Sequence, residues 1–340
     1  MELPLNQAAI IDIFSHLGDR IKSLPPETLE SLELNSANEN PWFTQENIQL
    51  SFDGLQAYLN KDDLSQWAEK LQFASTPKKV GLVMAGNVPL VGFHDMLVVL
   101  LSGNVALIKM SSKDSVLMRF VLDELMDIEP SIKTHFEVAE RLSGMDAVIA
   151  TGSDNSARYI EYYFGKYPHV IRKNRSSVAV LTGKESAEEL NALGKDIFSY
   201  FGLGCRNVSK VYVPDNYKFD PFFEAIEPYG KVVQLHKYTN NYDYNKSILL
   251  INGVKHLDNG FLLLQESESL VSPISVLFYE QYTNSEALSA RLEQQSGKIQ
   301  CVVGKGDDYI AFGAAQQPTL WDFADGIDTR NFLNRLANNN

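Results

Sequence analysis

The cysteine at position 205 has the sequence surroundings of a reactive thiol. It lies in segment 200–207, Tyr-Phe-Gly-Leu-Gly-Cys-Arg-Asn, where an amphipathic helical pattern ends and a β-type run at 210–213 is about to begin. The glycines before it let the backbone approach a ligand closely. Cys301, by contrast, sits within the run 299–303, Ile-Gln-Cys-Val-Val, where a small packing residue fits. The pattern predicts Cys205 as a catalytic nucleophile and Cys301 as a core residue.

Two strand-to-helix turns carry groups that can bind an anion or polarise a carbonyl. Segments 85–89, Ala-Gly-Asn-Val-Pro, and 151–155, Thr-Gly-Ser-Asp-Asn, each follow a predicted strand and open a predicted helix. Free N–H groups at such helix starts hold phosphates. Taken alone, each turn is explained more simply by ordinary turn and capping chemistry. The chain has no Gly-x-Gly-x-x-Gly fingerprint, so the standard dinucleotide-binding motif is absent from the sequence.

Composition narrows the class of protein and its partners. The 340 residues, 44% hydrophobic and 21% charged, can bury one large or two moderate cores. The net charge of −13 is spread along the chain without a basic stretch, which argues against nucleic-acid binding. Two separated cysteines and no Cys/His cluster favour a reducing compartment and no structural metal. No apolar run approaches about 18 residues and no signal pattern opens the chain, so we expect a cytoplasmic protein without a membrane span.

The spacing of apolar residues along the chain predicts an α/β fold. Residues 1–75 carry helical spacing, and from residue 79 short β-branched runs alternate with longer helical patterns, which implies mostly parallel, helix-covered sheets. A polar stretch at 182–187 suggests a boundary between two α/β units, at residues 1–183 and 184–340. Strands are predicted at 80–84, 105–108, 147–150, 178–181, 211–213, 232–235, 247–251, 274–279 and 301–303, with helices at about 88–102, 114–127, 155–164 and 186–201.

The order of these motifs resembles that of the aldehyde dehydrogenase superfamily. Segments 87–90, 102–109, 151–153 and 202–205 follow one another as the superfamily's motifs do. The resemblance implies a dinucleotide-binding domain in residues 1–183 and a catalytic thiol domain in residues 184–340. It also implies that Asn87 helps to form an oxyanion hole, that Lys109 reaches the cofactor ribose, and that Gly152 and Ser153 contact the dinucleotide phosphates.

Physical chemistry gives these roles a reason and leaves alternatives open. A thiolate attacking a carbonyl builds negative charge on oxygen, and one preorganised donor in a desolvated site contributes about 3 kcal/mol. The Asn87 amide and the Cys205 N–H suit that task. The alternative for Asn87 is a helix N-cap. The alternative for Lys109 is a solvated strand end.

The sequence departs from the oxidising members where they carry a glutamate that activates water. That region, 171–178, reads Ile-Arg-Lys-Asn-Arg-Ser-Ser-Val and contains no carboxylate. Losing general-base help slows hydrolysis by about two to four orders of magnitude, so a thioester on Cys205 is expected to persist. This segment, the short chain and Ser-Leu-Val-Ser-Pro at 269–273 most resemble the acyl-CoA reductases related to the fatty-acid reductase of bacterial bioluminescence.

The cofactor segment also departs from the pattern of NAD-preferring relatives. Where they carry a glutamate about three residues after the lysine, this chain has Ser112 and Lys113. Losing a negative charge and gaining a cation favours a 2′-phosphate, so NADPH is expected, with NADH as the alternative. Lys113 on a solvated helix face is the competing interpretation. Further on, Glu268 resembles the glutamate that holds the nicotinamide ribose, although spacing back from Pro273 points to its neighbour, Ser269.

Other side chains are candidates for moving a proton or tuning the thiol. His94 and His236 each lie near a motif and could protonate a leaving thiolate, but a lone histidine in such a context is more often structural. Arg206, beside the thiol, would lower its pKa if it points toward the sulfur.

Together these features predict an oxidoreductase that reduces an acyl-CoA, of the fatty acyl class, to the aldehyde with NADPH through a covalent acyl-Cys205 thioester. An acyl-phosphate reductase of the same architecture and an inactive binding or scaffold relative are the alternatives. The resemblance also allows a homo-oligomer and a partner protein that transfers acyl groups. Acyl chain length, oligomeric state and the general acid are not specified by the sequence.

Overall fold

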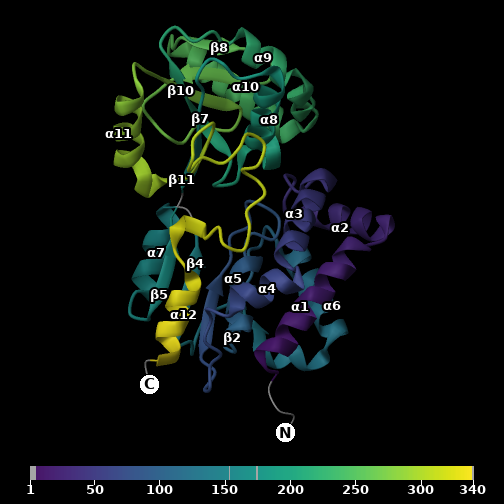
Figure 1. Ribbon diagram of the computed structural model, residues 1–340. Coiled ribbons are helices and arrows are strands. Elements are labelled where there is room, and N and C mark those ends of the chain that lie inside the picture. The colour runs from purple at the N-terminus through teal and green to yellow at the C-terminus, as the bar shows by residue number, and fades with distance from the viewer. Residues whose placement is uncertain (1–4, 153, 174, 339–340) are drawn as a thin grey trace. The chain divides into compact units, whose positions relative to one another are not determined.

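Two sheets covered by helices organise the chain into two compact units in the computed structural model, which describes residues 5–152, 154–173 and 175–338 (Figure 1). Unit 1 comprises Met1–Asn174 together with Thr319–Asn340, and unit 2 comprises Arg175–Pro318. Both sheets are mostly parallel, and a helical segment precedes the first strand. The predicted α/β class is therefore confirmed.

The sheet of unit 1 is wholly parallel, in the order β3-β2-β1-β4-β5. From β1 the chain moves outward through β2 to β3, then returns to the other side of β1 and continues through β4 to β5. The strand order thus reverses between β1 and β4, and ligands bind outside the carboxyl ends of the strands at such a switch point. The strands are β1 (Lys79–Val83), β2 (Val105–Lys109), β3 (Phe136–Val138), β4 (Ala147–Thr151) and β5 (His169–Arg172).

The amino-terminal helices of unit 1 cover the helix that follows β1. In α1 the side chains of Ile10, Phe14 and Leu17 recur on one face and are fully buried, and Asn6 caps the helix start. Phe14 meets Phe93 of α5 edge to face, with ring centroids 6.0 Å apart. The helices are α1 (Gln7–Lys22), α2 (Pro26–Glu39), α3 (Gln45–Tyr58), α4 (Lys61–Ala68), α5 (Phe93–Leu101), α6 (Ser115–Ile128), α7 (Asp154–Phe164) and α12 (Thr329–Asn338), with the 3₁₀ turns η1 (Pro130–His135) and η5 (Ala324–Gly326).

Unit 2 contains a six-stranded sheet in the order β11-β6-β7-β10-β9-β8, parallel except for the β8–β9 pair. Val178, Val180 and Tyr212 of its central strands form a buried cluster with Leu288 of α11. The strands are β6 (Ser176–Val180), β7 (Val208–Pro214), β8 (His256–Asp258), β9 (Leu263–Glu266), β10 (Val276–Tyr282) and β11 (Ile299–Val303). The helices are α8 (Ala187–Phe198), α9 (Asp220–Ile226), α10 (His236–Ile251) and α11 (Ser285–Gln295), with the 3₁₀ turns η2 (Ser199–Gly202), η3 (Glu227–Gln234) and η4 (Ser296–Lys298).

The limits of the two units differ from the predicted division at residues 183 and 184. Strand β6 pairs with β7 and β11, so residues 175–183 belong to unit 2. The polar stretch read as a boundary is the short β6–α8 connection, where Ser186 and Glu189 form a capping box. Segment 319–340 returns to unit 1, where the Asn334 amide donates to the Lys70 carbonyl at 2.9 Å. A return of the chain to an earlier unit leaves no local sequence signal.

Two predicted strands are wrong. Residues 232–235 lie largely in η3, and residues 247–251 form the last turn and a half of α10. Short apolar runs fit a helix as well as a strand, and here Tyr238, Tyr242 and Leu249 line one buried face of a longer helix. His236 therefore begins α10 rather than ending a strand. Strands β3, β5, β8 and β9 are short and were not predicted.

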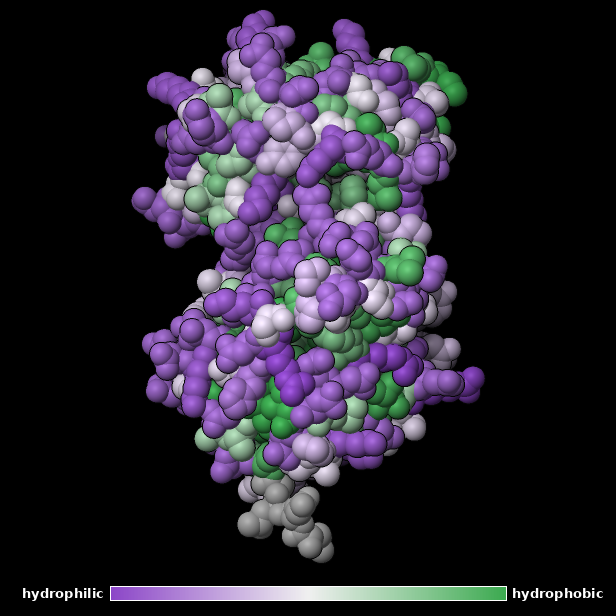
Figure 2. Space-filling view, turned by 90° about the vertical axis from the view of Figure 1, so that its right-hand side faces the viewer, coloured by the Kyte–Doolittle hydropathy of each residue, from purple (hydrophilic) through white to green (hydrophobic). Residues whose placement is uncertain are grey.

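The surface agrees with the acidic composition. Figure 2 shows mostly hydrophilic side chains on the visible face, with smaller hydrophobic patches between them. In the ranges that the structure describes, no helix has the length and apolar character needed to cross a membrane.

Candidate active site

Cys205 lies on an exposed turn between η2 and β7. The two cysteines of the chain are not joined by a disulfide. Just before the turn, Tyr200, Phe201 and Gly202 have φ of 50°, 55° and 80°. The left-handed region costs a non-glycine residue about 1 to 2 kcal/mol and persists only where the surroundings fix it. The backbone that leads to the thiol is therefore held in a strained shape.

Asn207 fixes the Cys205 turn to the end of α8. Its side chain is 2% exposed; Oδ1 accepts from the Gly204 N–H at 2.8 Å, and Nδ2 donates to the carbonyls of Asp196 at 3.1 Å and Ser199 at 2.8 Å. Asn207 was not among the residues predicted from the sequence. An asparagine three positions after Gly204 is a turn signal that would have indicated it.

A buried carboxylate ties a second loop to the same turn. Asp196, fully buried at the end of α8, accepts from the N–H groups of Gly313 at 2.6 Å and Ala315 at 2.9 Å. The Ala315 carbonyl in turn accepts from Arg206 Nε at 2.5 Å. Burial raises the pKa of Asp196 from 3.8 to about 6, against the lowering effect of the two amide bonds. One Arg206 N–H is thus committed to a carbonyl.

Ser177 links the two cysteines without joining them. Its hydroxyl donates to the Cys205 carbonyl at 3.0 Å and lies 3.0 Å from the sulfur of Cys301. Cys301 is half-buried in β11. It therefore has a polar contact in addition to the packing role expected from the sequence.

Asn87 is exposed on the loop that follows β1. The next helix, α5, begins at Phe93 and has Gly92 at its N-cap position. The N-cap alternative for Asn87 is therefore wrong. The loop between β1 and α5 carries its side chain outward at the carboxyl edge of the sheet.

Buried side chains from three other elements hold the Asn87 loop. The Asn40 amide donates to the Gly86 carbonyl at 3.0 Å, and the Ser51 hydroxyl donates to the Pro89 carbonyl at 2.7 Å. Asp114, just before α6, accepts from the Leu90 N–H at 2.7 Å, which supports the left-handed φ of 58° at Leu90. Burial raises the pKa of Asp114 well above its usual range.

The turn after β2 lies against the same loop. A Cβ added to Gly86 would stand 2.4 Å from Ser111 Oγ and 3.1 Å from Lys113 Cβ, so only glycine fits there. Lys109 is exposed at the end of β2, and Ser112 and Lys113 are exposed on the turn that follows. Lys113 precedes α6, which begins at Ser115, so it does not lie on a helix face as the alternative had it.

Gly152 lies at the end of β4, on the other side of the switch point from β2. Its N–H donates to the Arg172 carbonyl at 3.3 Å, and Ser153 lies outside the described residues. Pairing of β1 with β2 and β4 brings the Asn87 loop, segment 109–113 and Gly152 to one edge of the sheet. Lys109, Ser112, Lys113 and Gly152, four of the six residues predicted to bind the cofactor, thus lie at one edge of the unit 1 sheet.

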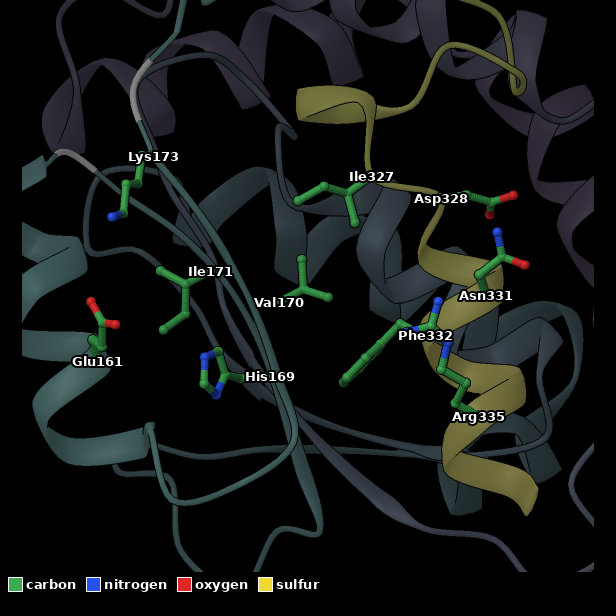
Figure 3. Close-up of a pocket in the computed structure, with 10 residues that line it drawn as sticks. All are labelled: Glu161, His169, Val170, Ile171, Lys173, Ile327, Asp328, Asn331, Phe332 and Arg335. Carbon is green, nitrogen blue, oxygen red and sulfur yellow. The ribbon is translucent and has the colours of Figure 1, made fainter. Parts of the chain in front are cut away.

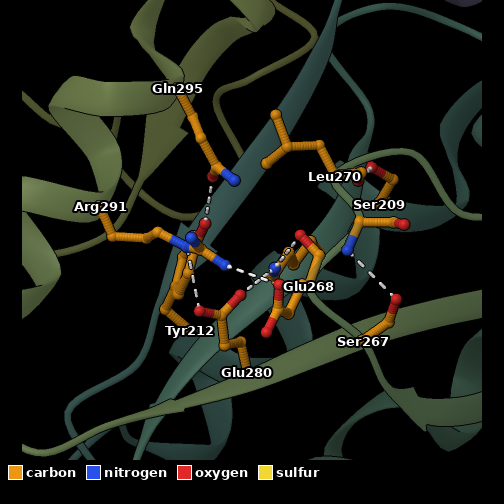
Figure 4. A network of polar contacts seen from close by, with 10 residues as sticks. Ser209, Tyr212, Ser267, Glu268, Leu270, Glu280, Arg291 and Gln295 are labelled. Atoms are coloured by element: carbon orange, nitrogen blue, oxygen red, sulfur yellow. Dashed lines mark hydrogen bonds and ion pairs between the residues drawn. The ribbon is translucent and has the colours of Figure 1, made fainter.

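Glu268 lies after β9 in unit 2, in the polar network of Figure 4. Its side chain is 90% exposed and stands 3.7 Å from Arg291 Nη2, while its carbonyl accepts from Lys210 Nζ at 3.1 Å. Arg291 also pairs with Glu280, 3.1 Å from Nε. Lys210, wholly buried, pairs with Glu280 as well, and burial lowers its pKa. The network orders the backbone at Glu268 and leaves its carboxylate facing solvent.

The two histidines differ in environment. His94 lies between the rings of Tyr58 and Trp67, and burial lowers its pKa to about 4. Its Nε2 is buried and has no hydrogen-bond partner in the described part of the chain. These surroundings favour a neutral, structural ring. His236 is exposed at the start of α10.

Arg172 forms a buried ion pair that was not predicted from the sequence. Its Nη1 donates to both carboxylate oxygens of Asp95, at 2.7 and 2.6 Å, and its Nη2 donates to Thr329 Oγ1 at 2.9 Å. The basic segment that replaces the expected glutamate thus has a structural use in joining the final segment to α5. Across the described residues, no group of His, Cys, Asp and Glu side chains is arranged to hold a metal ion.

The fold is similar to those of solved aldehyde dehydrogenases. The chain is similar in fold to a candidate aldehyde dehydrogenase of Burkholderia cenocepacia, with 13% identity, a TM-score of 0.64, and coverage of 92% of this chain and 76% of the other. An aldehyde dehydrogenase of Bacillus cereus in complex with NAD⁺ is 14% identical, with a TM-score of 0.60 and coverage of 88% of this chain and 72% of the other. The third structure is a cysteine-to-alanine mutant of aldehyde dehydrogenase C of Pseudomonas syringae, in complex with NAD⁺ and octanal. It is 13% identical, with a TM-score of 0.61 and coverage of 89% of this chain and 72% of the other.

At these identities the structures establish the fold alone. No relative was found among the curated proteins. The family model of the acyl-CoA reductase, LuxC, matches residues 56–227, just over half of the chain, and includes both the Asn87 loop and the Cys205 turn. The chain therefore belongs to the LuxC acyl-CoA reductase family.

Proposed function

We propose that this protein reduces an acyl-CoA to the aldehyde with NADPH, through an acyl thioester on Cys205. The observation that carries the proposal is an exposed thiol on a turn fixed from both sides, in a chain of the acyl-CoA reductase family. An exposed, preorganised thiol is suited to attack on a carbonyl. Fatty acyl groups are the proposed substrate class.

The proposed chemistry exchanges one thioester for another before reduction. The Cys205 thiolate forms a bond to the acyl carbon, and the bond from that carbon to the CoA sulfur breaks, so that CoA leaves as a thiolate and takes a proton. Bound NADPH would supply a hydride to the acyl carbon. In the resulting thiohemiacetal anion, the bond from the carbon to the Cys205 sulfur breaks. This step releases the aldehyde and regenerates the Cys205 thiolate. The Asn87 amide and the Cys205 N–H are the proposed donors to the oxyanion.

The residues at the carboxyl edge of the unit 1 sheet fit a phosphorylated dinucleotide. Lys109 and Lys113 are exposed, and neither ammonium group forms an ion pair with another described residue. Because Gly86 has no side chain, the Asn87 loop and the turn after β2 approach each other closely beside Lys113. The Bacillus and Pseudomonas proteins of the same fold bind NAD⁺. Ser112 and Lys113 replace a carboxylate in this chain, which supports NADPH over NADH because a cation attracts the 2′-phosphate.

Reduction rather than hydrolysis follows from the absence of a positioned base in the sequence. Segment 171–175 carries no carboxylate where oxidising relatives have one. Asp196, the carboxylate tied to the Cys205 turn, accepts backbone N–H groups with both oxygens. We therefore expect the acyl thioester on Cys205 to hydrolyse slowly and to react with hydride instead.

The direct test uses a labelled fatty acyl-CoA without NADPH. A stable adduct is expected on Cys205, absent in Cys205→Ala and retained in the control Cys301→Ala. Adding NADPH should release aldehyde with equimolar NADPH oxidation. An adduct on another residue would overturn the mechanism, and faster turnover with an acyl phosphate than with acyl-CoA would replace the substrate.

A further inference from the structure

The cavity of about 470 Å³ beside β5 favours no ligand of one charge (Figure 3). Among the side chains that line it, the carboxylates of Glu161 and Asp328 balance the cations of Lys173 and Arg335. The start of α6 is more informative, because a carboxylate from a distant part of the chain lies there, next to the proposed cofactor residues.

The N-terminus of α6 is capped by a residue of α2. Asp114 occupies the N-cap position, but its side chain makes no capping bond, because Oδ2 accepts from the Leu90 N–H at 2.7 Å. Glu39, the last residue of α2, takes over that task. Its Oε2 accepts from the N–H groups of Ser115 at 2.8 Å and Val116 at 3.2 Å, and its Oε1 accepts from the Ser115 hydroxyl. A carboxylate thus occupies the helix start from 76 positions away.

The end of α2 is fastened to both loops at the carboxyl edge of the sheet. Glu39 holds the start of α6, and the next residue, Asn40, donates to the Gly86 carbonyl in the Asn87 loop at 3.0 Å. A Cβ at Gly86 would lie only 3.1 Å from Lys113 Cβ, so the two loops are in close contact. The Glu39 carboxylate therefore has a fixed position near the turn that carries Lys113.

Glu39 and Lys113 act on this turn with opposite charges. Free N–H groups at a helix start favour phosphate, but here two of them already bind a carboxylate. Burial is the main cause of the raised pKa of Asp114, and the negative charge of Glu39 raises it further. The field of Glu39 thus extends over the turn after β2. Lys113 is exposed and forms no ion pair with another described residue, so it remains able to attract an anion.

We propose that Glu39 is a specificity-determining residue of the cofactor site. Its carboxylate takes the helix start that a 2′-phosphate would otherwise use and repels that phosphate, so it limits the preference for NADPH over NADH that Lys113 provides. The assignment rests on the proposed function, in which the phosphorylated ribose of NADPH binds at this turn. NADH has no 2′-phosphate and is insensitive to the charge of Glu39.

The test compares two nucleotides that differ in the 2′-phosphate alone. Adenosine 2′,5′-bisphosphate and adenosine 5′-monophosphate are titrated calorimetrically into the purified full chain, without acyl-CoA. Glu39→Gln should tighten binding of the bisphosphate by about five- to tenfold, because a repulsion is removed. Binding of the monophosphate should change by less than about twofold. Glu30→Gln, exposed on the same helix and about 13 Å away along its axis, is the matched control and should change neither.

Two further measurements separate the charge of Glu39 from its role as a cap. Lys113→Gln should have the opposite effect and weaken the bisphosphate by about tenfold, with the monophosphate unchanged. Raising the salt concentration to about 1 M should reduce the difference between the wild-type chain and Glu39→Gln, because salt screens the repulsion. A change caused only by a displaced loop would affect both nucleotides and would persist at high salt.

The outcomes distinguish this assignment from the proposed reaction. Equal changes for the two nucleotides in Glu39→Gln, or no change, would overturn the role of Glu39 and leave acyl-CoA reduction untouched. A selective gain for the bisphosphate, in a chain that oxidises no NADPH with acyl-CoA, would support Glu39 and overturn the proposed function. Failure of both nucleotides to bind would remove the cofactor from this edge and overturn both.

Discussion

The Asn87 loop and the Cys205 turn present exposed polar side chains on strained backbone, but they are held in different ways. The Asn87 loop is fixed by Asn40, Ser51 and Asp114, which lie 24 to 46 positions away from their partners in the chain. The Cys205 turn is held chiefly by Asn207, two residues after the thiol. A turn held by its own side chain leaves a trace in the local sequence, whereas a loop fixed by distant helices does not.

The buried acids of the two regions differ in how many of their carboxylate oxygens accept a hydrogen bond. Asp196 uses both oxygens to accept backbone N–H groups. Asp114 uses Oδ2 alone, and its buried Oδ1 has no hydrogen-bond partner in the described part of the chain. Replacing either acid by its amide keeps the size of the side chain and one acceptor oxygen. The change therefore tests whether the second acceptor and the charge of the carboxylate are needed.

Changing the exposed side chain of the Asn87 loop should have the largest effect on rate. Asn87→Ala is expected to lower kcat for the proposed reduction by about 10² to 10³, because one oxyanion donor is lost. The melting temperature should stay the same, since the side chain is exposed. Steady-state kinetics check this, with Asn240→Ala on α10 as a matched exposed control. An unchanged kcat would remove Asn87 from the oxyanion site.

On the other side of the comparison, Asn207→Ala should disturb both fold and thiol. Loss of the bonds to Gly204, Asp196 and Ser199 is expected to lower the free energy of unfolding by about 2 to 4 kcal/mol. Cys205 alkylation by iodoacetamide should change in rate, because the turn is released. Asn207→Asp, which keeps the acceptor for the Gly204 N–H, should give an intermediate result in urea unfolding and alkylation. An unchanged alkylation rate would make the role purely structural.

A smaller effect is expected at Asp196. In Asp196→Asn an amide N–H faces a backbone N–H of Gly313 or Ala315, which should lower the free energy of unfolding by about 1 to 3 kcal/mol at pH 7.

The pH dependence gives a separate check on Asp196. Because its pKa is raised from 3.8 to about 6 on folding, the folded state binds this proton more tightly than the unfolded state. Its contribution to the free energy of unfolding therefore falls as pH rises from about 4 to about 6. Asp196→Asn should lack that slope in urea titrations, and an identical slope in both proteins would contradict the assignment.

The smallest effect is expected at Asp114. In Asp114→Asn the amide oxygen still accepts from the Leu90 N–H, and the amide nitrogen replaces an oxygen that has no partner, so the free energy of unfolding should change by less than about 1 kcal/mol. Asp114→Ala removes the acceptor and should destabilise by about 1 to 3 kcal/mol. Equal losses in the two variants would show that the carboxylate charge matters at this position.

Much of the fold was predictable because its strands and helices differ in the spacing of apolar residues. Strands β1, β2, β4 and β7 lie where the sequence placed them, each as a short apolar run between helical patterns. The prediction of a strand at 247–251 failed because four apolar residues in a row have no period of their own. The site residues were predicted from motif order, which located segments but not the side chains that hold them.

The sequence by itself determined the alternation of strands and helices, the family, and the setting of Cys205 directly after a Gly-Leu-Gly segment. The tertiary structure alone decided that segment 319–340 joins unit 1, that Asn40, Ser51 and Asp114 hold the Asn87 loop, and that β5 is the end strand of the described sheet. The reason is physical: periodicity and turn chemistry act over a few residues, whereas a hydrogen bond to a distant carbonyl depends on which elements the folded core brings together.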